Sequence, residues 1–189
     1  MNKVQTLFLL IFSILLLVVF LYWQGRPFFC ECGSVSFWSG NIWSSENSQQ
    51  FSDPYSFTHL QHGLVFFILL AILLPKVNAN TKFIIAILTE TLWEIVENST
   101  FIINIYRTNT ASLGYTGDSI LNSVGDILFC VIGYFIAKML GIKKALIVFL
   151  LIEATMIYLL RDSLILNIIT MIHPFEIIVN WQLEASIAI

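Results

Sequence analysis

The chain has 189 residues, of which 58% are hydrophobic and 11% are charged, and its formal net charge is −3. A soluble domain carries about 25% charged residues, so this composition, with a mean hydropathy of +0.85, excludes an ordinary soluble protein and indicates an integral membrane protein. The small net charge and the lack of a basic patch give no indication of a nucleic-acid partner. At about twenty residues per span, the length predicts one all-α transmembrane domain, residues 1–189, built as a bundle of five to six transmembrane helices.

The first apolar segment, residues 4–23, has the position of a signal peptide but a different ending. It finishes with Phe20, Leu21, Tyr22 and Trp23, whereas signal peptidase needs small residues at its cleavage site. The segment is also long enough to cross a bilayer. We therefore expect an uncleaved first helix with an aromatic anchor at its far end.

The one large loop, residues 24–55, mixes tryptophans with many serines and glycines. This mixture predicts a lid that lies on the membrane surface or over the mouth of a pocket, on the periplasmic side. Cys30 and Cys32 lie in this loop, and in an oxidising compartment we expect them to form a disulfide. Free thiols, or a pair of soft metal ligands, are the alternatives for these two cysteines.

Four further apolar segments predict helices over residues 56–74, 83–105, 119–140 and 145–160. The tail, residues 163–189, is interrupted by polar residues and a proline, so it is either a sixth span or a re-entrant or interfacial helix. With the N-terminus in the cytoplasm, all six lysines fall on the cytoplasmic side, as the positive-inside rule requires: Lys3, Lys76, Lys82, Lys138, Lys143 and Lys144. The three arginines fall on the opposite side: Arg26, Arg107 and Arg161.

Polar residues collect in the outer half of the predicted spans. Glu90, Glu94 and Glu97 are spaced by four and then three residues, which places them on one helix face. An acid at the centre of a bilayer costs roughly 2.5–3.5 kcal/mol, so these side chains need a compensating environment. Two neighbouring helices offer similar stripes, with His59 and His62 on one and Asp118, Asn122 and Asp126 on the other. We expect a polar pocket that opens to the periplasm.

The residue types in this pocket suit metal and acid–base chemistry, because imidazole and carboxylate groups bind zinc, manganese or iron. The spacing matches no standard metal motif. The predicted catalytic residues are His59, His62, Glu94, Glu97, Asp118 and Asp126; the predicted metal ligands, for one divalent metal, are His59, His62, Glu94 and Asp126. The predicted substrate-binding residues are Asn98, Arg107, Asn122 and Arg161, the arginines acting as clamps on a phosphate. The alternative to a metal is a network in which Arg107 and Arg161 pair with the buried acids.

Three functions fit these residues. The first is binding or modification of an envelope lipid or a lipid-linked envelope precursor, with membrane lipids as partners and a metal assisting the chemistry. The second is a proton- or cation-coupled transporter, since intramembrane acids also build ion pathways. The third is a non-catalytic envelope assembly or resistance factor. The sequence leaves open whether the protein is an enzyme.

The chain contains, in order, the blocks "CECG", "SENSQQFSDPYSFTHLQHG", "ETLWEIVENS" and "GYTGDSILNSVGD". With these blocks, the chain from about Arg26 to Gln182 resembles an uncharacterised family of proteobacterial multi-pass inner-membrane proteins, catalogued as a domain of unknown function. This resemblance implies a multi-pass protein of the bacterial inner membrane and brings no activity. More distantly, the acid-rich helix followed by Arg and by "D…N…GD" looks like VanZ-like membrane proteins. That likeness implies work on cell-envelope lipid or glycan precursors, and only Glu94, Arg107, Asp118, Asn122 and Asp126 would carry over.

Overall fold

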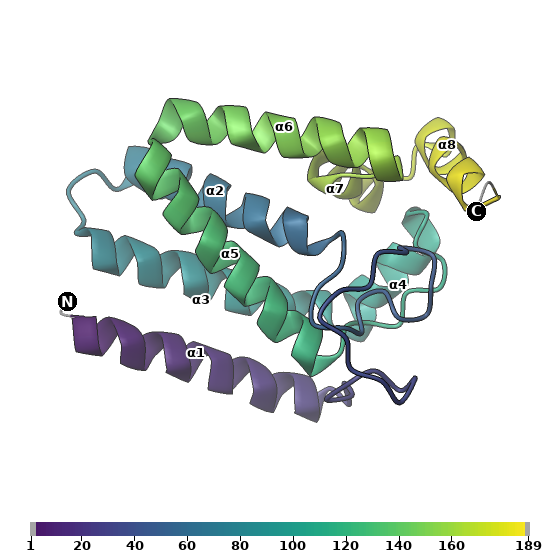
Figure 1. The fold of residues 1–189 in the computed structure, drawn as a ribbon, viewed down its shortest axis with the longest axis horizontal. Helices are drawn as coiled ribbons and strands as arrows, with labels where there is room; N and C mark the ends of the chain where they lie inside the picture. The colour runs from purple at the N-terminus through teal and green to yellow at the C-terminus, as the bar shows by residue number, and fades with distance from the viewer. Residues whose placement is uncertain (1–2, 188–189) are drawn as a thin grey trace.

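The computed structural model describes residues 3–187, which form eight helices and no strand. Figure 1 shows four long helices close to the long axis of the molecule, α1 (Lys3–Trp23), α2 (Ser56–Leu73), α3 (Ala79–Glu97) and α6 (Ile142–Leu160). A fifth long helix, α5 (Ile120–Leu140), crosses them obliquely. Three shorter helices and the loop of residues 24–55 gather at one end: α4 (Thr100–Asn109), α7 (Leu164–Ile172) and α8 (Glu176–Ile187). The expectation of an all-helical fold is therefore confirmed.

Three of the long helices, α1, α2 and α5, are long and apolar enough to cross a membrane. The two others, α3 and α6, have the same length class, with 19 residues each, but carry more charged residues. Large apolar side chains face outward along the bundle, among them Leu15 on α1 and Leu151 on α6. Such an exposed apolar surface fits contact with lipid rather than with water.

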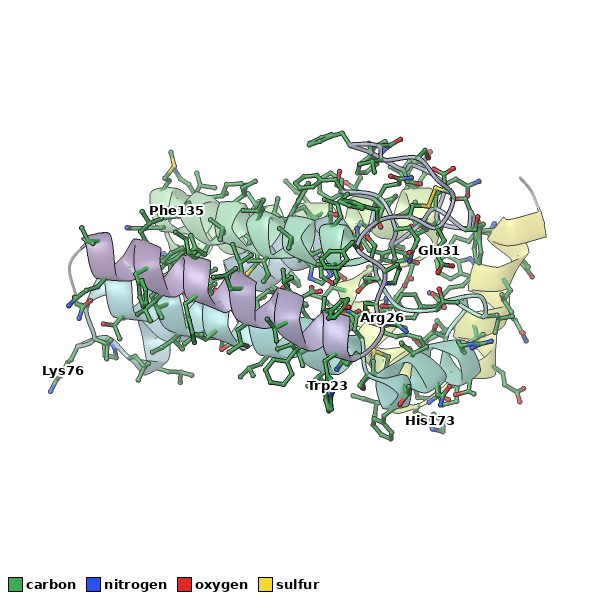
Figure 2. All side chains as sticks on the ribbon, turned by 90° about the horizontal axis from the view of Figure 1, so that it is seen from below. Trp23, Arg26, Glu31, Lys76, Phe135 and His173 are labelled. Carbon is green, nitrogen blue, oxygen red and sulfur yellow. A yellow bond between two sulfur atoms is a disulfide. The ribbon has the colours of Figure 1, made fainter. Side chains whose placement is uncertain are left out.

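The two ends of the bundle differ in charge and structure. Figure 2 shows Lys76 at one end, and Arg26, Glu31 and His173 at the other. The α2–α3 turn and the α5–α6 turn lie at the same end as the start of α1 (Figure 1). We call this the lysine end, and the end that carries residues 24–55, α4, α7 and α8 the loop end.

Two glycines allow α2 and α5 to pack in direct backbone contact. A Cβ on Gly63 would lie 2.0 Å from the carbonyl oxygen of Cys130, and a Cβ on Gly133 would lie 1.9 Å from that of Leu60. Real Cβ atoms do not approach a backbone oxygen so closely, so both positions need glycine. Towards the lysine end, buried apolar side chains fill the space beside this contact, for example Leu64 and Ile127.

The third predicted helix, residues 83–105, is wrong in its boundaries, because the chain breaks after Glu97. The side chain of Asn98 donates to Asp118 at 2.8 Å and accepts from the backbone N–H of Asp118 at 2.7 Å. Ser99 then accepts from the backbone N–H of Ile102 and begins the separate helix α4. The sequence pattern missed this break because both segments are apolar and no proline or glycine separates them.

The tail forms two short helices, α7 with nine residues and α8 with twelve. Each is shorter than the roughly twenty residues that a span needs, which favours the re-entrant or interfacial alternative, and the placement of the tail in a membrane stays a prediction. Buried Glu153 on α6 accepts from the backbone N–H groups of Leu164 and Ile165 and from the side chain of Gln61. A carboxylate at a helix N-terminus is favourable, so Glu153 fixes the start of α7.

Gly63→Ala and Gly133→Ala are each expected to lower the free energy of unfolding by about 1–3 kcal/mol, because the added methyl group forces two backbones apart. Thermal unfolding in detergent measures the effect. Gly114→Ala is the matched control, since a Cβ at Gly114 meets no atom within 4 Å. Unchanged unfolding of both helix variants would contradict the close α2–α5 contact.

Candidate functional site

Burial separates the acidic from the basic side chains. Eight of the twelve acidic residues are buried, whereas no lysine or arginine whose side chain the structure describes is buried. Five of the buried acids gather with two histidines where α2, α3 and α5 approach the loop end. We call this group the acid–histidine cluster; its members are His59, His62, Glu90, Glu94, Glu97, Asp118 and Asp126.

His59 on α2 lies at the centre of the cluster. Its Nδ1 is 2.7 Å from Oε1 of Glu90 and 3.1 Å from Oε1 of Glu94, while its Nε2 is 3.9 Å from Oδ2 of Asp126. His62 lies one turn further along α2, and its Nδ1 is 3.0 Å from Oε2 of Glu90. One imidazole nitrogen carries at most one proton, so the two histidines cannot satisfy all the surrounding carboxylate oxygens.

Several buried oxygens of the cluster accept no hydrogen bond from the described residues. They are both carboxylate oxygens of Glu94, Oε2 of Glu97 and Oδ1 of Asp126. Glu94 Oε1 is close to His59 Nδ1, but the two groups lack hydrogen-bond geometry. A buried carboxylate without a partner is costly, so these oxygens call for a cation or a donor.

The ligand atoms form two sets whose members all lie within 4.8 Å of one another. One set is His59, His62 and Glu90, and the other is His59, Glu94 and Glu97. Among the four predicted metal ligands, His59, His62 and Glu94 belong to these sets, whereas Asp126 belongs to neither. Glu90 is not among the predicted ligands, although its spacing of four from Glu94 places it on the same helix face and is the signal that points to it.

Asn98, Asp118 and Asn122 hold the helices and the loop together. Asn98 and Asp118 join the end of α3 to the segment before α5 through two hydrogen bonds. Asn122 donates to the backbone oxygen of Gln50 at 2.8 Å and so fastens the loop of residues 24–55 to α5. These contacts give Asn98 and Asn122 structural roles. Their binding of a substrate stays a prediction.

The predicted arginine clamps lie away from the cluster. Arg107 is exposed on α4, and Arg161 donates to the backbone oxygen of Trp181 and pairs with Glu184 at 3.3 Å. Neither arginine lines the cavity described below. Pairing of the buried acids with Arg107 and Arg161, the alternative to a metal, is therefore not what the described residues show.

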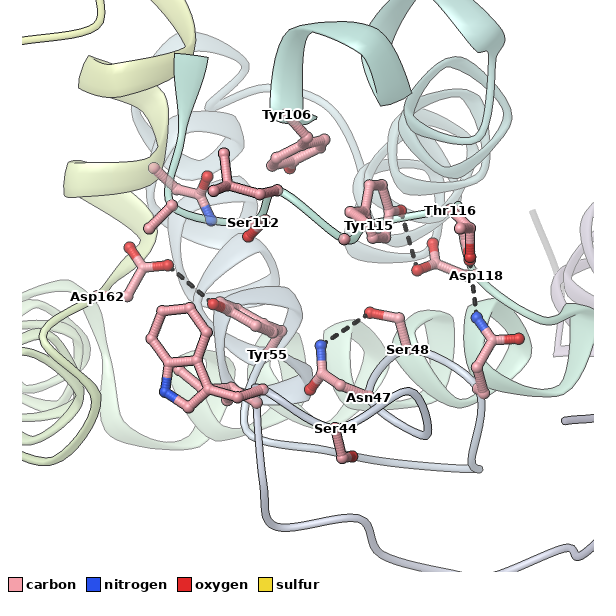
Figure 3. A pocket seen from close by; sticks show the side chains of 18 of the residues that line it. Ser44, Asn47, Ser48, Tyr55, Tyr106, Ser112, Tyr115, Thr116, Asp118 and Asp162 are labelled. Carbon is pink, nitrogen blue, oxygen red and sulfur yellow. Dashed lines mark hydrogen bonds between the residues drawn. The ribbon is translucent and has the colours of Figure 1, made fainter. Parts of the chain in front are cut away.

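A cavity of about 500 Å³ opens beside the cluster at the loop end. His59, Glu97, Asp118 and Asp126 line it together with aromatic residues, and no lysine or arginine is among its described lining residues. Three tyrosine hydroxyls in its wall each donate to a carboxylate, and Figure 3 shows two of these pairs on opposite sides of the pocket. The three pairs are Tyr55–Asp162 at 2.9 Å, Tyr106–Glu97 at 2.8 Å and Tyr115–Asp118 at 2.9 Å.

The loop of residues 24–55 forms one wall of the cavity. Ser119 donates its backbone N–H to the carbonyl of Ser48, and Arg26 donates to the carbonyl of Thr116. Cys30 and Cys32 form a disulfide in this loop, which Figure 2 draws as a yellow bond. The loop is thus a folded cover that is fastened to the segment before α5.

Burial raises the pKa of Asp162 from 3.8 to about 6, and the negative charge of Glu153 adds to this rise, while hydrogen bonds from Ser163, Tyr55 and Gln182 oppose it. Burial is also the main cause of the raised pKa of Tyr55, to which the charge of Asp162 contributes. The hydroxyl of Tyr55 therefore stays protonated at neutral pH and donates to Asp162.

The raised pKa of Asp162 predicts a pH-dependent stability. The folded protein holds the proton more tightly than the unfolded chain, so the free energy of unfolding falls as the pH rises from about 4 to about 6, by on the order of 2–3 kcal/mol. Asp162→Asn is expected to remove this fall, which chemical unfolding in detergent at pH 4 to 7 measures against the wild type. Glu176→Gln, at an exposed acid, is the control. A pH-independent difference between Asp162→Asn and the wild type would contradict the raised pKa.

Comparison with known proteins identifies the family. Residues 21–184 match the family described as "Protein of unknown function (DUF2585)". The chain is 44% identical over 162 residues to a UPF0314 protein of Brucella anthropi, covering 86% of this chain and 82% of that protein. It is 43% identical over 169 residues to a UPF0314 protein of Paracoccus denitrificans, covering 89% and 88%.

No solved structure matches the chain. The match to the family and the identities of these proteobacterial relatives confirm the resemblance to an uncharacterised family, while the more distant likeness to VanZ-like proteins stays a prediction. The chain belongs to the DUF2585 family.

Proposed function

We propose that this protein holds a divalent cation in the acid–histidine cluster and uses it to bind or modify the head group of an envelope lipid or lipid-linked precursor. The observation that carries the proposal is Glu94, a fully buried glutamate whose two oxygens accept no hydrogen bond from the described residues and whose neighbours are His59 and further carboxylates. A divalent cation would balance this charge, and imidazole with carboxylate ligands suits zinc, manganese or iron.

The proposed setting is a bacterial inner membrane crossed by five helices, α1, α2, α3, α5 and α6, with the N-terminus in the cytoplasm. Support comes from the similar length of these helices and from the lysines at one end of the bundle. The cavity then opens towards the periplasm, at the level where lipid head groups of the outer leaflet lie. A cation at its floor would act as a Lewis acid on a head-group oxygen.

The apolar core argues for a site rather than a transport pathway. Between the cluster and the lysine end, the buried side chains of α2, α3 and α5 are mostly apolar, as Leu64, Ile87 and Ile127 illustrate, and no buried acid or base is among the described ones. A proton or cation pathway would need polar groups or water along this stretch. The described residues of the core therefore favour binding or chemistry at the loop end.

Metal content tests the proposed cation. Elemental mass spectrometry on protein purified without chelator is expected to find about one divalent metal per chain in the wild type. Glu94→Gln keeps the shape of the side chain but removes its charge, and it is expected to lose most of the metal, as is the His59→Ala/Glu94→Ala double variant. Glu153→Gln is the matched control, because Glu153 is an equally buried glutamate whose oxygens are already occupied by donors. The proposal would be refuted if the wild-type protein contained no metal even after incubation with divalent metal salts. It would also be refuted if Glu94→Gln contained as much metal as the wild type.

Thiol labelling tests the proposed orientation. The native cysteines give little background, because Cys30 and Cys32 form a disulfide and Cys130 is buried. Ser45→Cys, exposed at the loop end, is expected to react with a membrane-impermeant maleimide in spheroplasts. Ala79→Cys, exposed at the lysine end, is expected to react only after the membrane is disrupted. The reverse pattern would place the cavity in the cytoplasm.

A further inference from the structure

The buried atoms of the described cavity wall include acceptors that are not used. Four buried side-chain oxygens that line the cavity lack a hydrogen-bond partner among the described residues: Asn47 Oδ1, Glu97 Oε2, Asp126 Oδ1 and Gln182 Oε1. Every buried lining atom left without a partner in the described part of the chain is thus an oxygen. A ligand that satisfies these oxygens must donate hydrogen bonds or carry positive charge.

The charge of the walls selects a cationic donor. Four carboxyl groups line the cavity, those of Glu97, Asp118, Asp126 and Asp162, without a lysine or arginine among the described lining residues. An anionic group placed against these walls would be repelled, whereas an ammonium group would gain charge-assisted hydrogen bonds. A divalent cation held by Glu94 and Glu97 would leave Asp162 without a bound cation, because Asp162 belongs to neither set of possible metal ligands. Gln182 Nε2 donates to Asp162 at 3.0 Å, and Gln182 Oε1 accepts no hydrogen bond from the described residues.

Aromatic rings stand beside these carboxylates. Trp43, Tyr55, Tyr106 and Tyr115 line the cavity, and the rings of Tyr106 and Tyr115 meet edge to face with centroids 5.0 Å apart. Each tyrosine hydroxyl already donates its hydrogen to a carboxylate, so a ligand in the cavity would contact these residues mainly through their aromatic rings. Aromatic faces with adjacent carboxylates are the surroundings that bind ammonium groups.

We propose that the cavity recognises its ligand through a protonated amine, which donates to the free oxygen of Gln182 beside the negative charge of Asp162 and the aromatic wall. This inference rests on the proposed function, since it names the chemical class of the head group that the cavity takes. The amine belongs either to a lipid head group or to a free amine-bearing molecule such as an amino sugar. Both sources present the same ammonium group, and the experiment separates them.

Two pairs of probes test the amine with the purified full chain in detergent at pH 7. Glucosamine is compared with glucose, and lysophosphatidylethanolamine with lysophosphatidylglycerol, by calorimetry and thermal shift. We expect the amine of at least one pair to bind about tenfold more tightly than its partner. A preference in the lipid pair alone identifies a lipid amine, and a preference in both pairs shows that the amine itself suffices. Equal binding within both pairs overturns the inference.

Variants locate the amine in the cavity. Asp162→Asn and Trp43→Leu are each expected to reduce the preference for the amine by about fivefold or more. Trp38→Leu is the matched control, because Trp38 lies in the same loop and does not line the cavity. Trp43 is a half-buried loop residue, so its variant keeps the test available if Asp162→Asn does not fold. An unchanged preference in Trp43→Leu overturns the inference.

Metal content is measured in the same samples, so the two proposals fail separately. Bound metal without a preference for the amine overturns this inference and leaves the proposed cation site standing. A preference for the amine without bound metal supports this inference and overturns the cation.

Discussion

The structure depends on how the negative charge buried between α2, α3 and α5 is balanced. Five carboxylates surround two histidines there, and no lysine or arginine whose side chain is described is buried with them. Two like charges 4 Å apart repel by about 4 kcal/mol at an effective dielectric constant of 20. Protonated histidine or carboxyl groups relieve part of this repulsion, and a divalent cation would relieve more of it. A helix in a membrane setting can carry Glu90, Glu94 and Glu97 because all three side chains are buried inside the bundle and do not face lipid.

Packing elsewhere holds the helices together against this repulsion. Gly63 and Gly133 let the backbones of α2 and α5 touch, and apolar side chains fill the space towards the lysine end. At the loop end, the paired hydrogen bonds of Asn98 and Asp118 fix the segment before α5. The polar half of the bundle is therefore kept in place by contacts on both sides of the cluster.

The buried acids fall into two kinds, according to their partners. Asp53 accepts from the backbone N–H groups of Ser48 and Tyr55, and Glu153 accepts from the N-terminus of α7, so both have structural roles. Glu94, in the acid–histidine cluster, and Asp126, in the cavity wall, keep oxygens that accept no hydrogen bond from the described residues. The proposed function depends on the acids with free oxygens. A buried oxygen without a hydrogen bond lowers the stability of the fold, and a bound ligand would remove that cost.

The sequence alone predicts the all-helical fold, three helices that could cross a membrane, the family and the positions of four of the five long helices, because each of these follows from apolar length, composition and ordered blocks of residues. It also placed Glu90, Glu94 and Glu97 on one face, since helical spacing is a local property. The folded chain alone shows that Glu90 contacts both histidines, that Arg107 and Arg161 lie away from the buried acids, and that the helix breaks at Asn98. These features arise from contacts between segments distant in sequence, such as Asn98 with Asp118, and no local pattern records which partner a polar side chain will meet.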